Sequence, residues 1–319
     1  MQPMTHRFTA ELRRLQHDSH DTCCHCGRPF READTAHAGY AEDGRPLYVG
    51  DCCRSGLSET AARFYWMPRP YDLPKAESSL WRYMDFSKFV ALLKDMAIHF
   101  ARADHLGDRF EGAKGVASNR IVWDDYYLRS FREAIRNPPP GYKCELSDEE
   151  VQREAERLLR EMATAGKRDL STTYVSCWHE SEVESEALWR LYCPPPSSGV
   201  AIRTTFSALK QSLGDELDIE IGRVRYIDFR KGFAGPNDAI FRKRQSLSHE
   251  KEVRAVIRRP DDSSDAGLLC AADLGVLLKS VVISPFAPLW FSRILDETMA
   301  RFGVSTEITM SDLLSEPFF

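Results

Sequence analysis

The sequence lacks the features that mark a membrane or secreted protein. No apolar run approaches the roughly 20 residues that a membrane-spanning helix needs, and the opening residues MQPMTHRFTA contain no apolar segment of a secretory signal. The chain also lacks an overall basic charge, because 48 acidic residues outnumber 43 basic residues and leave a net charge of -5. We therefore expect a cytoplasmic protein without a membrane partner, and nucleic acid would have to bind through a local basic face.

The nine cysteines are unevenly placed, and five of them lie in the stretches TCCHCGRPF and YVGDCC. Thiols stay reduced in the cytoplasm, so clustered cysteines favour a metal site over disulfides. Cys23 and Cys26 have the spacing of a zinc knuckle, and Cys52 and Cys53 follow a hairpin-like segment that would bring them back to it. The pattern predicts a structural zinc site in a small unit that has too little core to fold alone.

The fourth zinc ligand is the least certain of the set. Adjacent cysteines point in different directions, so Cys52 and Cys53 can both bind one ion only across a turn. His37 and Cys24 are the alternatives to Cys53. The competing interpretation is a group of buried free thiols without a metal.

The chain divides into two units by composition. Residues 1–70 form the zinc-ribbon-like unit, and residues 71–79 read as an extended linker, since three prolines lie between Pro68 and Pro74. Residues 80–319 alternate helical and strand patterns. We expect an α+β fold with a mixed sheet in this larger unit.

The larger unit contains one strong helix signal and several strand signals. SDEEVQREAERLLREM opens with a capping box formed by Ser147 and Glu150 and continues with apolar residues on one face. SKFVALLKDM is a second helix, with Ser87 as its expected N-cap. TTYVSCWH, EVRAVIRR and KSVVISP read as strands by alternation and β-branching.

The motifs of this unit occur in the order of a known bacterial family. LWRYMDFSKFVALLKDMAIHFARADHLGDRFEG, YVSCWHESEVESEALWRLYCPPPSSGVAIRTT and FRKRQSLSHEKEVRAVI resemble the opening, centre and end of domain of unknown function 2971, over residues 80–311. Its acidic motif corresponds to Asp108-Arg109-Phe110-Glu111. Gly107 and Ser284 replace residues that are common in that family.

A second resemblance implies an activity. A strand bearing Arg, a helix, a strand bearing Ser and a late strand with Glu-x-Glu is similar to the ADP-ribosyltransferase fold. This resemblance implies that Arg82, Ser176 and either Glu250 or Glu252 are catalytic, and that NAD is a substrate. The sequence VSCW departs from the Ser-Thr-Ser of the arginine-type enzymes of that fold.

The two glutamates suit such chemistry for a physical reason. Cleavage of the nicotinamide–ribose bond develops positive charge on the ribose, which a nearby carboxylate stabilises. On a strand, Glu250 and Glu252 would point to one face, because side chains alternate. The competing interpretation is a surface ion-pair ladder with Lys251 and Arg254.

Further residues are candidates for binding the substrate. Arg82 would clamp phosphate or ribose by paired hydrogen bonds, an aromatic ring would stack on a base, and a basic side chain of the tract FRKR would contact phosphate. Asp108 and Glu111 would add carboxylates, although they could equally cap a turn and a helix. The remaining candidates for binding are Tyr83, Trp178, Tyr192 and Lys243.

Three functions are compatible with these features. The first is an ADP-ribosyltransferase-like enzyme that uses NAD to modify a macromolecule, with nucleic acid as one acceptor, in a toxin or anti-phage role. The second is a nucleic-acid glycosidase or hydrolase that uses paired carboxylates. The third is a non-enzymatic, zinc-dependent binding module, so the sequence leaves open whether the protein is an enzyme.

Overall fold

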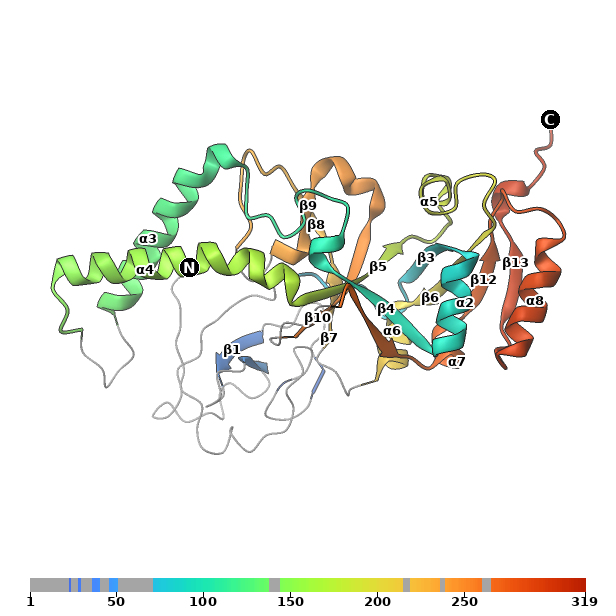
Figure 1. Cartoon of the computed structure of the whole chain (residues 1–319), viewed down its shortest axis with the longest axis horizontal. Helices are drawn as coiled ribbons and strands as arrows, with labels where there is room; N and C mark the ends of the chain where they lie inside the picture. The colour runs from blue at the N-terminus through green and yellow to red at the C-terminus, as the bar shows by residue number, and fades with distance from the viewer. Residues whose placement is uncertain are drawn as a thin grey trace.

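The computed structural model describes most of the larger unit and small parts of the N-terminal unit (Figure 1). The described residues are Cys23, Arg28, Pro29, 36–40, 46–50, 71–137, 144–214, 219–235, 239–259 and 265–319.

A nine-stranded mixed sheet is the centre of the fold (Figure 1). Its strand pairs are antiparallel except for the parallel pair β12–β13. The strands are β3 (Ser79–Asp85), β4 (Ala97–Arg102), β5 (Thr173–Glu180), β6 (Gly199–Thr205), β7 (Ile219–Arg223), β10 (Glu252–Arg258), β11 (Gly267–Ala271), β12 (Ser280–Ile283) and β13 (Glu307–Met310). The mixed sheet with interspersed helices confirms the α+β class expected from the sequence.

Two smaller pairs of strands lie outside this sheet. Strands β8 (Arg225–Ile227) and β9 (Arg242–Arg244) pair in parallel. Strands β1 (Ala36–Tyr40) and β2 (Pro46–Gly50) pair antiparallel, so the segment between the two cysteine groups is a hairpin, as expected.

The helices have the following bounds. The α-helices are α2 (Phe86–Asp95), α3 (Arg120–Arg136), α4 (Asp148–Ser171), α5 (Glu186–Tyr192), α6 (Phe206–Leu213), α7 (Leu274–Leu277) and α8 (Phe291–Arg301). The 3-10 turns are η2 (Ala103–His105), η3 (Ala117–Asn119), η4 (Ala239–Phe241), η5 (Gln245–Glu250) and η6 (Asp312–Leu314). No helix of the described residues combines the length and the apolar composition required to span a membrane.

Local signals explain where the helices begin and end. The capping box of α4 forms as expected, with Ser147 and Glu150 satisfying each other's backbone N–H groups. The expected cap of α2 is wrong by two positions. Asp85 is the N-cap and accepts from the backbone N–H of Lys88, whereas Ser87 lies inside the helix. Asp85 precedes the first apolar residue directly and leaves β3 without a loop.

The main hydrophobic core lies between one face of the sheet and helices α2, α6, α7 and α8. Leu92 and Leu93 of α2, Leu209 of α6 and Leu295 of α8 are buried there against the strands. On the other face, Trp189 of α5 packs on Trp81 and Tyr83 in a separate cluster. The buried apolar surface on both sides fixes which face each strand residue occupies.

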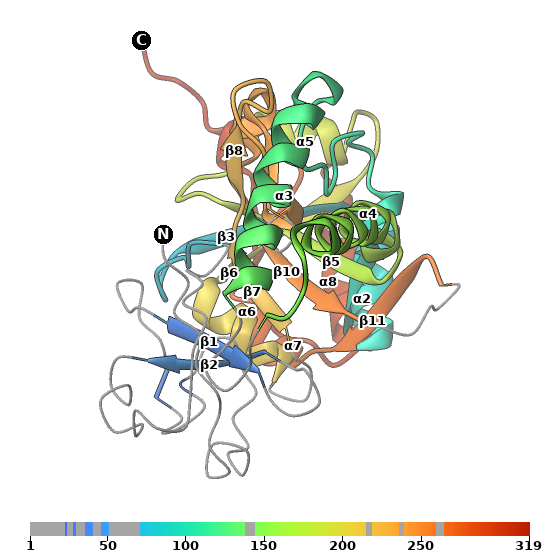
Figure 2. The same cartoon turned by 90° about the vertical axis from the view of Figure 1, so that its left-hand side faces the viewer.

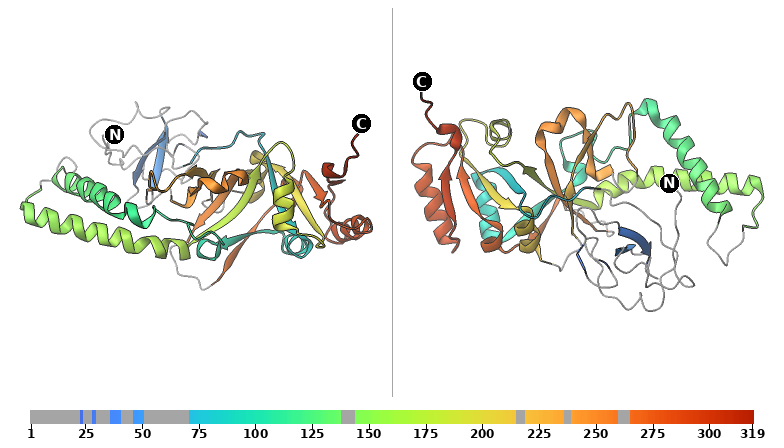
Figure 3. Two further views of the ribbon diagram at one scale, coloured as in Figure 1. Left: turned by 90° about the horizontal axis from the view of Figure 1, so that it is seen from above. Right: turned by 180° about the vertical axis from the view of Figure 1, so that it is seen from behind.

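Helices α3 and α4 form an arm that extends from one end of the sheet (Figures 1 and 3). Seen along the long axis of the molecule, α4 lies beside α3 and in front of the strands (Figure 2). Trp123 of α3 is buried, with Lys114 and Arg120 above its ring. The start of α3 is therefore tied to the loop that precedes it.

The sheet forks at β5. Strand β10 pairs with β5 along its whole length. On the opposite edge, β4 pairs only at Val175 and Tyr174, and β3 pairs only at Glu180 and His179. The residues between, 176–178, therefore face a split between β3 and β4. Arg82 bridges the split, because its Nη2 donates to the backbone carbonyl of His99 at 3.0 Å.

Candidate functional site: a buried charge network

The most unusual feature of the larger unit is a set of charged side chains buried on one face of β10. Arg254 lies at its centre and its side chain is 1% exposed. Its Nε donates to Glu252 at 2.5 Å, and its Nη1 and Nη2 donate to the two oxygens of Glu111. Nη1 also donates to the carbonyl of Ile240. This planar fork of donors uses both carboxylates, a geometry that lysine cannot reproduce.

Glu252 is the most strongly held carboxylate of the network. Besides Arg254, it accepts from Nζ of Lys243 at 3.0 Å. Burial raises its pKa, but the charges of Arg254 and Lys243 outweigh burial and lower the pKa to about 2. Glu252 is therefore a permanent anion at physiological pH.

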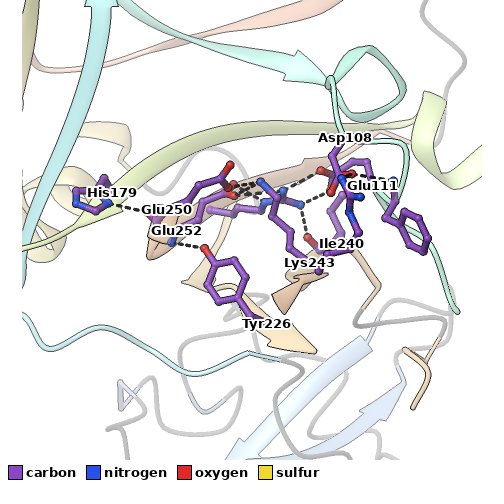
Figure 4. Close-up of polar contacts among 11 residues, drawn as sticks. Asp108, Glu111, His179, Tyr226, Ile240, Lys243, Glu250 and Glu252 are labelled. Atoms are coloured by element: carbon purple, nitrogen blue, oxygen red, sulfur yellow. Dashed lines mark hydrogen bonds and ion pairs between the residues drawn. The ribbon is translucent and has the colours of Figure 1, made fainter. Parts of the chain in front are cut away.

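Glu250 reaches the same lysine from outside the strand. The two carboxylates do meet at one lysine, but not by alternation along one strand as expected. That expectation is wrong, because β10 begins at Glu252 and Glu250 is the last residue of η5. Lys251 between them adopts a left-handed backbone with φ of 39°. This turn returns the Glu250 carboxylate to Lys243, where it forms an ion pair (Figure 4). The Glu250 side chain is 16% exposed, so it lies at the rim.

Asp108 and Glu111 enter the network from one loop. Glu111 binds Arg254, and Asp108 accepts from Nη2 of Arg244 at 2.6 Å and from the backbone N–H of Phe110 at 3.1 Å. The loop therefore supplies one carboxylate to the centre and another to a flanking ion pair. In Figure 4 these two residues lie at the opposite end of the network from His179. Glu111 is thus linked to the predicted carboxylate Glu252 through Arg254, and Asp108 lies beside it on the same loop.

Two tyrosines line the network. Tyr226 accepts the backbone N–H of Glu252 on its hydroxyl at 2.8 Å and so fixes the start of β10. Tyr192 ends α5 and is 46% exposed. Burial of its hydroxyl end, together with the negative charges of Glu250 and Glu252, raises the pKa of Tyr192 to about 12. Its hydroxyl stays neutral at physiological pH, beside the carboxylates.

Two residues of β5 share the face of the network, and sequence reasoning missed one of them. Cys177 pairs with Arg254 across the strands, and burial, followed by the charge of Glu252, raises the pKa of its thiol. The thiol stays protonated and hydrogen-bonds to Glu252, so it is no nucleophile.

The missed residue is His179, which pairs with Glu252. Its Nδ1 lies 2.6 Å from the carbonyl of Glu250, which can only accept, so Nδ1 carries the proton. Burial lowers its pKa and leaves Nε2 as an unprotonated nitrogen. The alternation of β5 places it beside Cys177, but no sequence signal gives its partner.

Three predicted residues lie on the opposite face of β5 or across the fork. Ser176 and Trp178 pair with Ala255 and Val253, which face the main core. The Trp178 indole N–H donates to the Ser176 hydroxyl at 3.2 Å. Arg82 lies 5.5 Å above the Trp178 ring, and burial lowers its pKa. The structure therefore brings Arg82, Ser176 and Trp178 together but separates them from the carboxylates.

Tyr83 belongs to neither group. Its hydroxyl accepts the backbone N–H of Ser185 at 2.7 Å, and its ring packs edge-on against Trp189 at 4.9 Å. The ring lies 6.3 Å from that of His179. Tyr83 holds α5 against the sheet, and α5 in turn carries Tyr192 toward the network.

The predicted zinc ligands lie mostly outside the described residues. Cys23 is described, is buried and donates its backbone N–H to the carbonyl of Arg28 at 2.9 Å. The other predicted ligands lie outside the described residues: Cys26, Cys52 and Cys53, the alternative Cys24, and the side chain of His37. Within the described part of the chain, no group of three or more His, Cys, Asp or Glu side chains is arranged to hold a metal. The zinc site stays a prediction.

Comparison of the chain with protein-family models, with curated proteins and with solved structures finds no match. The resemblances to family 2971 and to ADP-ribosyltransferases therefore stay predictions. The chemistry of the network rests on its own geometry.

Proposed function

We propose that the larger unit is an ADP-ribosyltransferase-like enzyme that transfers the ADP-ribosyl group of NAD to a macromolecule. The observation that carries the proposal is the buried carboxylate of Glu252, paired with Arg254 and Lys243 and held beside the rim carboxylate of Glu250. The relation to family 2971, the ADP-ribosyltransferase-like fold and the structural zinc unit of residues 1–70 are part of the same proposal.

The charges of the network suit a cationic transition state. Glu111, Glu250 and Glu252 face two cations, Arg254 and Lys243, so one negative charge remains in excess. A fixed anion in a buried setting stabilises developing positive charge without reorganising during the reaction. The ribosyl oxocarbenium formed when nicotinamide leaves is such a charge.

The ionised state of Glu252 favours transfer from NAD over glycoside hydrolysis with Glu252 as the acid. A glycosidase needs one carboxyl group that is protonated near neutral pH to donate to its leaving group. The lowered pKa of Glu252 rules it out as that donor. Nicotinamide leaves NAD as a neutral molecule, because the pair of electrons of the broken bond returns to its cationic ring nitrogen, so no acid is required.

The proposed roles follow from exposure. Glu250, at the rim of the network, contacts the ribose. It also takes the proton of the acceptor atom as the lone pair of that atom bonds to the anomeric carbon. Glu252, which is 5% exposed, supplies the fixed charge behind it, and Lys243 holds the two carboxylates together. Tyr192 offers a half-exposed ring on which a base can stack.

The experiment measures nicotinamide release and label transfer from NAD carrying a labelled adenylate, with single- and double-stranded DNA, RNA and proteins as acceptors. We expect Glu250→Gln to lower the rate by about 100-fold or more, as for loss of one preorganised electrostatic group. Glu186→Gln is the matched control, because Glu186 forms an exposed ion pair with Arg190 on α5. The proposal fails if wild-type protein neither releases nicotinamide nor transfers label, or if both variants react at the wild-type rate.

A further inference from the structure

A basic and aromatic surface lies next to the charge network, on the side of Arg244. It is made by the ring residues of the Asp108 loop, α3 and the segment after β8, together with basic residues of the same segment and β9. We call it the basic–aromatic surface, and its residues are Phe110, Tyr126, Arg230, Lys231, Phe233 and Arg244.

The basic residues of the surface belong to the segment of the chain with the largest positive charge. Residues 219–259 contain eleven lysines and arginines against five aspartates and glutamates, although the whole chain carries -5. The Arg230 side chain is 81% exposed although it binds both carboxylate oxygens of Asp228, whose side chain is 20% exposed. Water and salt reach the guanidinium, so another anion can compete for it. Lys231 is exposed and has no ion-pair partner among the residues that the structure describes.

A continuous chain of contacts connects the surface to the network. Arg244 binds Asp108 and lies 5.1 Å above the ring of Phe110. Phe110 packs 5.4 Å from Phe229, which precedes Arg230 in the chain. Asp108 and Phe110 share their loop with Glu111, which binds Arg254 at the centre of the network.

Further contacts connect the surface to helix α3 of the arm. Phe233 lies 5.6 Å from Tyr126 of α3, and Tyr126 is 48% exposed. Asn119, at the start of α3, donates to the carbonyls of Phe229 and Arg230 at 3.0 and 2.9 Å. These bonds fix the backbone that presents the cations next to the exposed ring.

Exposed cations beside the exposed ring of Tyr126 fit single-stranded nucleic acid best. Basic side chains follow the phosphates, and rings stack on unpaired bases, which a duplex keeps inside its own stack. An acidic peptide would use the charges but not the flat ring. An anionic membrane is bound through basic residues that border the apolar face of one helix, whereas Arg230 and Lys231 lie in a turn after β8.

We infer that the basic–aromatic surface binds single-stranded nucleic acid and thereby presents it to the charge network as the acceptor. The first half of this inference rests on the surface alone. The second half rests on the proposed function.

The experiment uses the full chain and fluorescence anisotropy with a fluorescein-labelled 20-nucleotide DNA strand, the same RNA strand, the DNA duplex and vesicles of anionic phospholipid. We expect the single strands to bind more tightly than the duplex, and Arg230→Glu/Lys231→Glu to weaken binding at least 10-fold. The dependence of log Kobs on log salt should become shallower by about 0.7 for each lost phosphate contact. Tyr126→Ala should weaken binding about 10-fold through lost stacking.

The matched controls lie at the other end of the molecule, in and beside α8 (Figure 1). Arg293→Glu/Arg301→Glu makes the same change in net charge, and Trp290→Ala removes an aromatic ring that is 62% exposed. Both should bind as wild type. Equal loss in test and control variants, equal binding of duplex and single strand, binding to vesicles only, or no binding at low salt would each overturn the inference.

Nicotinamide release into water, measured on the same variants, separates the two proposals. Binding of the single-stranded nucleic acid without turnover of NAD would support the inferred surface and contradict the proposed function. Turnover of NAD without binding of the nucleic acid would support the proposed function and contradict the inferred surface.

Discussion

Two arginines of this protein have the same chemical partners but opposite surroundings. Arg254 is held by Glu111 and Glu252 under β10, and Arg157 is held by Glu154 and Glu161 on α4. The Arg254 side chain is 1% exposed and that of Arg157 is 50% exposed. Water replaces the partners of Arg157 if they are lost, whereas the partners of Arg254 have no substitute.

The largest expected effect follows directly from this difference. Arg254→Met leaves Glu111 and Glu252 buried without their cation, and we expect it to lower the free energy of unfolding by about 3–5 kcal/mol. Arg157→Met should leave the urea midpoint unchanged. Urea denaturation followed by circular dichroism measures both. Equal midpoints for the two variants would mean that the network is as well solvated as the surface of α4.

A smaller and pH-dependent effect distinguishes the glutamates. The pKa of Glu252 is about 2 in the folded protein and ordinarily 4.5, so its contribution to stability is present above pH 4.5 and is lost as the pH falls toward 2. We expect Glu252→Gln to flatten the fall in stability over this window. Glu154→Gln, on the exterior of α4, should retain the wild-type fall. Parallel curves for all three proteins, measured by thermal unfolding at each pH, would contradict the assignment.

The smallest expected effect tests whether an exposed contact of α4, its capping box, contributes to stability. Ser147→Ala removes the side-chain acceptor of the capping box, and we expect a loss of about 1 kcal/mol. Ser130→Ala on α3 is the control, because the Ser130 hydroxyl only donates to a carbonyl within its helix, that of Tyr126. Chemical denaturation should separate the two. A loss at Ser130 equal to that at Ser147 would show that the cap has no special weight.

Patterns local in sequence predicted the elements well. The capping box of α4, the alternation of β5 and the helical pattern of α2 depend on residues within a few positions of one another. The mixed sheet followed from the interspersed patterns. The cap of α2 was misplaced because Asp85 and Ser87 are both good N-caps, and the position where β3 ends decides between them.

The site was predictable only in part, because its contacts are long-range. Glu111 and Arg254 are 143 residues apart, and no spacing in the sequence joins them. Alternation correctly implies that Ser176 and Trp178 share one face of β5, but it does not say which face carries the charges. The pairing of β5 with β10 decides that, and it also brings His179 opposite Glu252.

The left-handed residue between the two glutamates has a consequence for protein design. A designer who grafted EVRAVIR onto another strand would transfer Glu252 and Arg254 but lose Glu250, since the carboxylate pair depends on a backbone turn at Lys251 rather than on the strand. The smallest transplantable unit therefore runs from β9 through η5 into β10, so that Lys243 travels with both glutamates. Glycine is the natural replacement at position 251, because it adopts positive φ without strain.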